Sequence, residues 1–179
     1  FPNLNCIVVV DADFSGMGFD LRSTEKNLQL YNQLSGRAGR FSKDSLIIYQ
    51  TFHPSGRTLK NILENRQDKF MDEEMLLRKE KNLPPFTRLI AIIVSSKNEK
   101  DGLYEAQKIK KNLLQIRNID ILGPVSSPIF KIKNKYRTRL LLRFRNNLFV
   151  QKVVSNILKK INISKKIKLT VDVDPLNFS

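Results

Sequence analysis

TRLIAIIV, residues 87–94, is the stretch on which the fold of the second half of the chain depends. A run rich in β-branched residues, without Gly or Pro inside it, is typical of a buried strand. Leu83-Pro84-Pro85-Phe86 comes directly before it, and two prolines block a helix and favour an extended link. We therefore expect a domain boundary here, with domains of residues 1–83 and 84–179.

Four further elements are predicted downstream of this strand. They are a helix capped by Asn98, a hairpin of residues 125–132 and 136–144, a helix capped by Asn147, and a strand over residues 166–172. Both helices carry apolar residues three and four positions apart, and the last strand alternates apolar and polar residues. The order β-α-β-β-α-β predicts an α+β split βαβ sandwich, with one sheet and two helices on one face.

The first half has the alternating strand and helix order of an α/β protein. Residues 5–11 (NCIVVVD) form a continuous apolar run, which we expect to be a central strand covered on both faces. A helix capped by Ser23 or Thr24 is expected to stop at the glycines Gly36 and Gly39, and residues 45–52 are predicted to be the next strand. Residues 58–81 have a helical composition.

Composition excludes several classes of protein. The chain has 179 residues, of which 41% are hydrophobic, enough to build one core or two small ones. No apolar run approaches the ~20 residues of a membrane-spanning helix, so we expect no membrane partner. One Cys and one His exclude a disulfide framework and a Cys/His metal site, so no metal is predicted here. Because the chain begins with Phe1 and an apolar strand follows, we expect a fragment of a longer protein.

The positive charge is concentrated in the second half. Lys and Arg outnumber Asp and Glu by 32 to 17, for a net charge of +15, but residues 1–83 are almost neutral. This asymmetry favours nucleic acid as a partner of residues 84–179. The alternative is a merely solvated basic surface in a chain whose Lys, Asn and Ile content reflects an AT-rich genome.

The octet Gln33-Leu-Ser-Gly36-Arg37-Ala-Gly39-Arg40 carries the clearest chemistry. Guanidinium groups match phosphate oxygens, and arginine fingers stabilise charge on a transferring γ-phosphoryl group. We expect Arg37 and Arg40 to act in this way, with Gln33 orienting a water molecule and Gly36 and Gly39 lining the ATP site. The alternative is an ordinary glycine-rich helix end with basic residues near the negative pole of the helix dipole.

The octet resembles motif VI of superfamily 2 helicases. The stretches around it resemble the PriA (primosomal protein N′) family of replication-restart helicases, in the order expected for that family. These stretches are FPN at 1–3, IVVVDAD at 7–13, DLRSTEK at 20–26, NLPPF at 82–86, LGPV at 122–125 and VDVDP at 171–175.

This resemblance implies a fold and an activity. Residues 1–83 would close the second RecA-like lobe of an ATP-dependent 3′-to-5′ DNA helicase of the bacterial cytoplasm. Residues 84–179 would form a C-terminal domain similar to a small-subunit ribosomal protein. ATP and Mg²⁺ would be bound mainly by parts outside this chain, as would zinc, so the segment alone is expected to be inactive. A non-enzymatic nucleic-acid-binding module and another superfamily 2 repair helicase remain as alternatives.

The predicted hairpin is strongly basic. If its loop has three residues, 134–136, the odd-numbered residues of both strands share one face and the even-numbered apolar residues share the other. A two-residue loop would reverse the parity and scatter the charges over both faces. The shared basic face would bind a phosphate backbone without sequence preference, unless it is only a solvated sheet edge. The candidate DNA-binding residues are Lys131, Lys133, Lys135, Arg137, Arg139 and Arg143.

The family resemblance also implies partners. These are forked and single-stranded DNA, other primosome proteins and single-stranded DNA-binding protein, whose acidic tail would dock near Gln151. An arginine expected one turn earlier is Asn147 here, and Lys152 is the candidate replacement.

Overall fold

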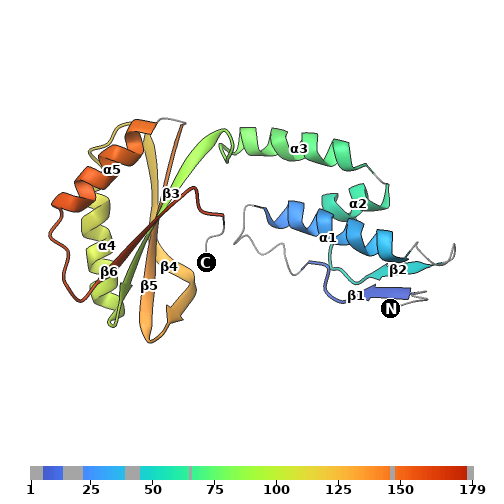
Figure 1. Ribbon diagram of the computed structural model, residues 1–179, viewed down its shortest axis with the longest axis horizontal. Coiled ribbons are helices and arrows are strands. Elements are labelled where there is room, and N and C mark those ends of the chain that lie inside the picture. Colours follow the sequence, from blue (N-terminus) through green and yellow to red (C-terminus); the bar gives the residue numbers. More distant parts are fainter. Residues whose placement is uncertain (1–5, 14–21, 39–44, 65, 146–147, 177–179) are drawn as a thin grey trace. The chain divides into compact units, whose positions relative to one another are not determined.

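The computed structural model forms two compact units, Phe1–Leu76 (unit 1) and Leu77–Ser179 (unit 2). Both mix helices and strands, and each contains one sheet (Figure 1). This confirms the predicted α/β class. The residues that the structure describes are 6–13, 22–38, 45–64, 66–145 and 148–176.

Unit 1 is built on a pair of parallel strands. Its elements are β1 (Cys6–Val9), α1 (Ser23–Ala38), β2 (Leu46–Tyr49) and α2 (Arg57–Leu63), while α3 (Gln67–Glu80) continues into unit 2. β1 and β2 pair from Cys6 opposite Leu46 to Val9 opposite Tyr49. The Tyr31 hydroxyl of α1 donates a hydrogen bond of 2.7 Å to the carbonyl oxygen of Ala12, which ties the helix to the end of β1.

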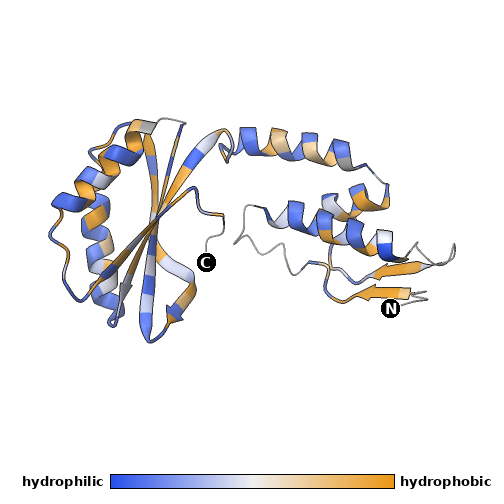
Figure 2. Ribbon diagram, in the orientation of Figure 1, coloured by the Kyte–Doolittle hydropathy of each residue, from blue (hydrophilic) through white to orange (hydrophobic). Residues whose placement is uncertain are grey.

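One expectation for unit 1 is wrong, and another holds. The first strand is not covered on both faces, since Val8, Leu46 and Ile48 are each about half exposed. Figure 2 shows that β1 and β2 are both strongly hydrophobic. Among the described residues, α1 is the helix that packs against both strands, which leaves the other face of this short sheet uncovered. α1 ends at Ala38, between Gly36 and Gly39, where the sequence predicts that the helix stops. Gly36 is exposed, and a Cβ placed there would meet nothing within 4 Å, so nothing at this position forces the helix to stop.

Unit 2 has the predicted β-α-β-β-α-β order. Its elements are β3 (Thr87–Ser96), α4 (Glu99–Leu113), β4 (Ile119–Ile132), β5 (Lys135–Arg145), α5 (Leu148–Lys160) and β6 (Lys168–Val173). The strands lie in the order β4-β5-β3-β6, and each neighbouring pair is antiparallel. Asn98 caps α4 as expected, because its side-chain oxygen accepts a 2.9 Å hydrogen bond from the backbone N–H of Lys100. The predicted cap Asn147 lies outside the described residues.

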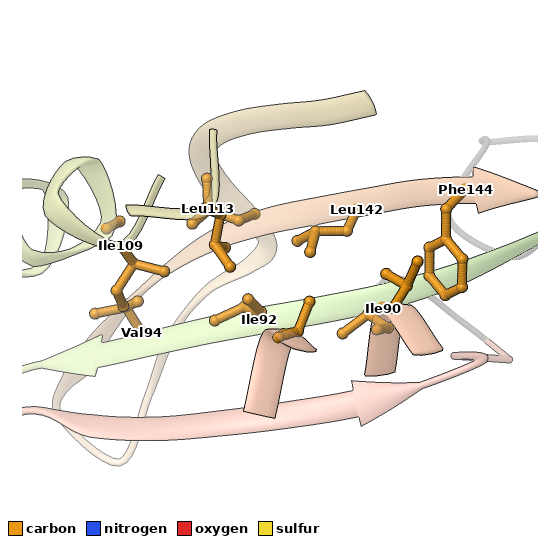
Figure 3. Close-up of a cluster of buried hydrophobic side chains, with 11 residues drawn as sticks. Ile90, Ile92, Val94, Ile109, Leu113, Leu142 and Phe144 are labelled. Atoms are coloured by element: carbon orange, nitrogen blue, oxygen red, sulfur yellow. The ribbon is translucent and has the colours of Figure 1, made fainter. Parts of the chain in front are cut away.

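The core of unit 2 is assembled around β3. Ile90, Ile92 and Val94 are at most 1% exposed and contact buried residues of β5, α4 and α5 (Figure 3). Both helices pack on the same face of the sheet (Figure 1). Each fully buried aliphatic side chain stabilises the fold by about 1.5–3 kcal/mol before losses of conformational entropy are counted. β5 and β6 take their register directly from β3, and β4 takes its register from β5.

The hairpin between β4 and β5 closes in a two-residue turn, Lys133-Asn134. Both residues have positive φ, 47° and 61°, and Ile132 pairs with Lys135. Left-handed conformations at both central positions match the twist of the flanking strands, which favours this tightest form of hairpin. The predicted three-residue loop is therefore wrong.

Candidate functional site

The face of β5 opposite α4 and α5 carries arginines. Alternation along the strand buries Leu140, Leu142 and Phe144 against the helices, so residues of the other parity point away from them. These side chains are half-buried rather than fully exposed. We call this surface the arginine face, and its cationic members are Lys135, Arg137, Arg139 and Arg143.

The two-residue turn divides the six predicted DNA-binding residues. Lys133 lies in the turn, and Lys131 pairs with Tyr136, which belongs to the opposite face of β5. Only the four residues of β5 share a face, because a two-residue loop reverses the parity between the strands. The expectation that all six residues lie on one face is thus corrected.

Arg143 is anchored at one end of the arginine face. Its Nε and Nη2 donate to a carboxylate oxygen of Asp120 on β4, at 3.0 and 2.9 Å, and its Nη1 donates to the carbonyl oxygen of Lys81 at 3.3 Å. Both oxygens fix the guanidinium plane. Each nitrogen of the guanidinium is thus engaged, so Arg143 organises the face more than it reaches outward.

Arg139 lies at the middle of the face between apolar neighbours. It pairs with Ile93 of β3 on one side and with Val125 of β4 on the other. Burial lowers the pKa of the Arg139 guanidinium, and the positive charge of Arg137 lowers it further. Two cations held close together, one of them partly desolvated, make a surface that favours an anion.

A β-bulge positions the β4 residues of this face. Asp120 and Val125 differ in parity, yet the register shifts between Leu122 and Val125 so that both lie opposite arginines. Gly123 lies in the bulge with φ of 89°, and a Cβ there would be only 2.6 Å from the carbonyl oxygen of Arg139. The position therefore requires glycine.

A basic cavity continues from the end of the arginine face. It has a volume of about 610 Å³ and is lined by Arg117, Arg143 and Arg145, with Asn82, Asn118 and Asp120 among its other polar residues. Arg117 and Arg145 are exposed, and neither has a carboxylate partner among the described residues. Sequence reasoning missed Arg117, because it lies in the loop after α4 and only the fold brings it beside β5.

The sequence that forms the hairpin and the strands beside it is poor in acidic residues, although Asp120 lies opposite Arg143. From Ile121 to Val171 the sequence holds 13 Lys and Arg and no Asp or Glu. The arginine face and the hairpin turn therefore have few local counter-charges, which is the electrostatic pattern of a surface that binds a polyanion.

The motif residues of unit 1 are presented on one helix. Gln33 and Arg37 are both exposed and lie four positions apart on α1, which places them on the same side of the helix. Gly36 between them leaves the backbone open to an approaching group. Gly39 and Arg40 lie outside the described residues.

Gln151 on α5 belongs to a polar network that closes unit 2. With its amide oriented to match its donors, Gln151 accepts hydrogen bonds of 2.7 and 3.1 Å from the Arg88 guanidinium. Arg88 also forms an ion pair with Asp174, and this hydrogen bonding holds the pKa of the Asp174 carboxyl below its usual value of 3.8. The residue that orients Gln151, Arg88, is one that sequence reasoning missed.

Beside this network is an apolar groove between α5 and β6, with a volume of about 420 Å³. Its cationic side chain is Lys159, and the exposed Lys152 lies one residue after Gln151 on the same helix. The groove lining consists of Ile90, Gln151, Val154, Ser155, Leu158, Lys159, Leu169, Val171 and Val173.

Neither a metal site nor a membrane-spanning helix is found in the part of the chain that the structure describes. Among the residues that the structure describes, no three His, Cys, Asp or Glu side chains come together in a way that would hold a metal ion. None of the helices in this same part of the chain has the length and apolar character needed to cross a membrane.

Comparison with known proteins relates both units to one group. Residues 79–176 match the family model described as the primosomal protein N C-terminal domain. The chain is 33% identical to "Replication restart protein PriA" of Rickettsia felis over 99% of its length, and 33% and 35% identical to the PriA proteins of Bacillus subtilis and Chlamydia trachomatis over 98%. It spans 27%, 22% and 24% of these three relatives, about a quarter of their length.

Proposed function

Because the chain belongs to the PriA family of replication restart proteins, we propose that it serves as the C-terminal portion of an ATP-dependent 3′-to-5′ DNA helicase that restarts replication at stalled forks. The identity over nearly the whole chain, across both units, is the observation that carries this proposal. In this account unit 1 contributes to the motor, and unit 2 binds DNA and partner proteins.

Unit 1 suits a role as part of a larger RecA-like lobe. Two parallel strands joined by a helix are one step of a parallel α/β sheet, and the half-exposed Val8, Leu46 and Ile48 offer an apolar surface that further elements of such a lobe would cover. Arg37 and Gln33, exposed on one side of α1, are available to the γ-phosphate and the attacking water. ATP and Mg²⁺ would be held mainly by the rest of the helicase, and zinc by other parts of the protein.

Unit 2 provides the DNA-binding surface. The arginine face presents four cations on one strand, and Lys131 and Lys133 extend the positive charge to the end of the hairpin. Cationic side chains on a β-surface contact phosphates and carry no sequence information, so the binding should be non-specific and steeply salt-dependent. The basic cavity around Arg117 and Arg145 enlarges this surface beyond the hairpin.

The groove beside Gln151 suits a different ligand. It is apolar inside and has Lys152 and Lys159 on its helix, which complements a peptide that is acidic and carries an apolar residue. We therefore assign docking of the acidic tail of single-stranded DNA-binding protein to this groove.

The motor assignment is tested in the full-length protein. Arg37→Ala and Arg40→Ala should each reduce DNA-stimulated ATP hydrolysis by about a thousandfold, because an arginine finger acts in the transition state. DNA affinity should change little. Arg66→Ala, which removes another exposed arginine of unit 1 paired with Glu64 at 3.1 Å, is the matched control and should leave hydrolysis intact. Unaltered hydrolysis in both finger variants would favour the non-enzymatic binding module.

The DNA-binding assignment is tested on the 179-residue chain by titrating a single-stranded oligonucleotide at several salt concentrations. Replacing Lys133, Arg137 and Arg139 by Gln should reduce the slope of log affinity against log salt by about 2, since each lost phosphate contact removes about 0.7.

The control is a second triple variant in which Lys97, Lys100 and Lys111, exposed at or before α4, are replaced by Gln. It has the same net charge, so it reports the effect of charge alone. If both variants reduce the slope equally, the arginine face has no special role in DNA binding.

The peptide assignment is tested with a synthetic peptide of the acidic tail and fluorescence anisotropy. Gln151→Glu should weaken binding about 10-fold, because a carboxylate at this position repels the tail and pairs with Arg88. Gln107→Glu, an exposed change on α4, adds the same charge at a distance and should have little effect. Equal affinities for the two variants would place the tail elsewhere.

A further inference from the structure

The end of the β4–β5 hairpin exposes apolar side chains that the fold does not use. Ile129, Phe130 and Ile132 are 47%, 40% and 40% exposed, and none of them belongs to the buried core of unit 2. Figure 2 shows hydrophobic residues at this end of β4. We call residues 129–136 the hairpin tip.

The tip combines an aromatic pair with an ammonium group. The Phe130 and Tyr136 rings meet edge to face, with centroids 5.2 Å apart. The Lys131 Nζ lies 4.7 Å from the centre of the Tyr136 ring and 3.5 Å from its hydroxyl oxygen. The ring and the hydroxyl thus hold the ammonium against Tyr136, whose ring in turn contacts Phe130.

This arrangement has the two parts that a nucleotide needs. A base needs a flat apolar surface, which Phe130 offers, and its phosphate needs cations, which Lys131, Lys133 and Lys135 supply. The tip lies within the stretch from Ile121 to Val171 that contains no Asp or Glu, so a polyanion meets no repulsion from that stretch. Lysine side chains alone would be enough to bind a phosphate, but they would not account for the exposed ring of Phe130.

We propose that the hairpin tip binds an unpaired nucleobase of a single-stranded nucleic acid, with the base stacked on Phe130 and the adjoining phosphates on Lys131 and Lys133. This inference rests on the proposed function, since it takes the polyanion of unit 2 to be nucleic acid. It adds a contact that reads the presence of a base, whereas the arginine face contacts only the backbone. Stacking accepts any base, so the contact distinguishes unpaired from paired strands and does not read sequence.

The experiment compares two oligonucleotides of about 15 units on the 179-residue chain, one of thymidine and one with the same backbone but abasic throughout. Phe130→Ala should weaken binding of the thymidine strand about 10-fold and leave binding of the abasic strand unchanged. Phe130→Trp should retain affinity, and Phe130→Leu should lose as much as Phe130→Ala, because only a ring stacks. Phe52→Ala removes a ring that is 89% exposed in unit 1 and is the control.

The outcomes separate this inference from the proposed function. If the wild-type chain binds neither oligonucleotide, the DNA-binding role of unit 2 fails. If it binds both but Phe130→Ala does not weaken binding of the thymidine strand, or weakens both strands equally, the stacking contact is overturned. An apolar and basic tip also suits an anionic lipid surface, and vesicles of phosphatidylcholine and phosphatidylserine test that alternative. Loss of vesicle binding in Phe130→Ala, with DNA binding unchanged, would identify a lipid surface instead.

Discussion

Pairing of β3 with both of its neighbours is the constraint on which the rest of unit 2 depends. β3 joins β5 from Thr87 to Ser96 and β6 from Ile90 to Ser95, and its residues Ile90, Ile92 and Val94 are almost fully buried under two helices. A shift of one residue would move these side chains out of the core and expose them, at a loss of several kcal/mol. The register of the sheet is therefore fixed by the core.

The charged surface follows from this core. Because Leu140, Leu142 and Phe144 must point toward the helices, Arg137, Arg139 and Arg143 must point the other way. The chain accepts a partly desolvated guanidinium at Arg139 and holds Arg143 on Asp120. The core and the proposed polyanion-binding surface thus lie on opposite faces of the same strand.

Much of this could be predicted from the sequence, and the failures have physical reasons. Apolar residues three and four positions apart predicted the helices, and the apolar run at residues 87–94 predicted the first strand of unit 2. The β-α-β-β-α-β order and the Asn98 cap were predicted correctly. The hairpin turn was not predicted, because Lys133-Asn134 lacks the Asn-Gly signature of a two-residue turn although both residues adopt positive φ. That one turn determines which face Lys131 occupies.

Contacts between residues far apart in the sequence could not be predicted from local sequence patterns either. Arg117 reaches the basic cavity and Arg88 reaches Gln151 only through the tertiary fold, and neither residue lies in a recognisable motif. The burial of the first strand was overestimated, because an apolar run does not reveal which of its two faces the rest of the chain covers. Local periodicity predicts helices and strands well, whereas packing and register decide which residues come together in a site.

The central claim, that the hairpin and the arginine face form the nucleic-acid surface, is tested most directly by lysine-acetylation footprinting with a single-stranded oligonucleotide. Lys131, Lys133 and Lys135 should become protected on binding, while Lys100 and Lys111 of α4, on the helix-covered side, should keep their reactivity. Uniform protection of all five lysines, or protection strongest on α4, would contradict the account.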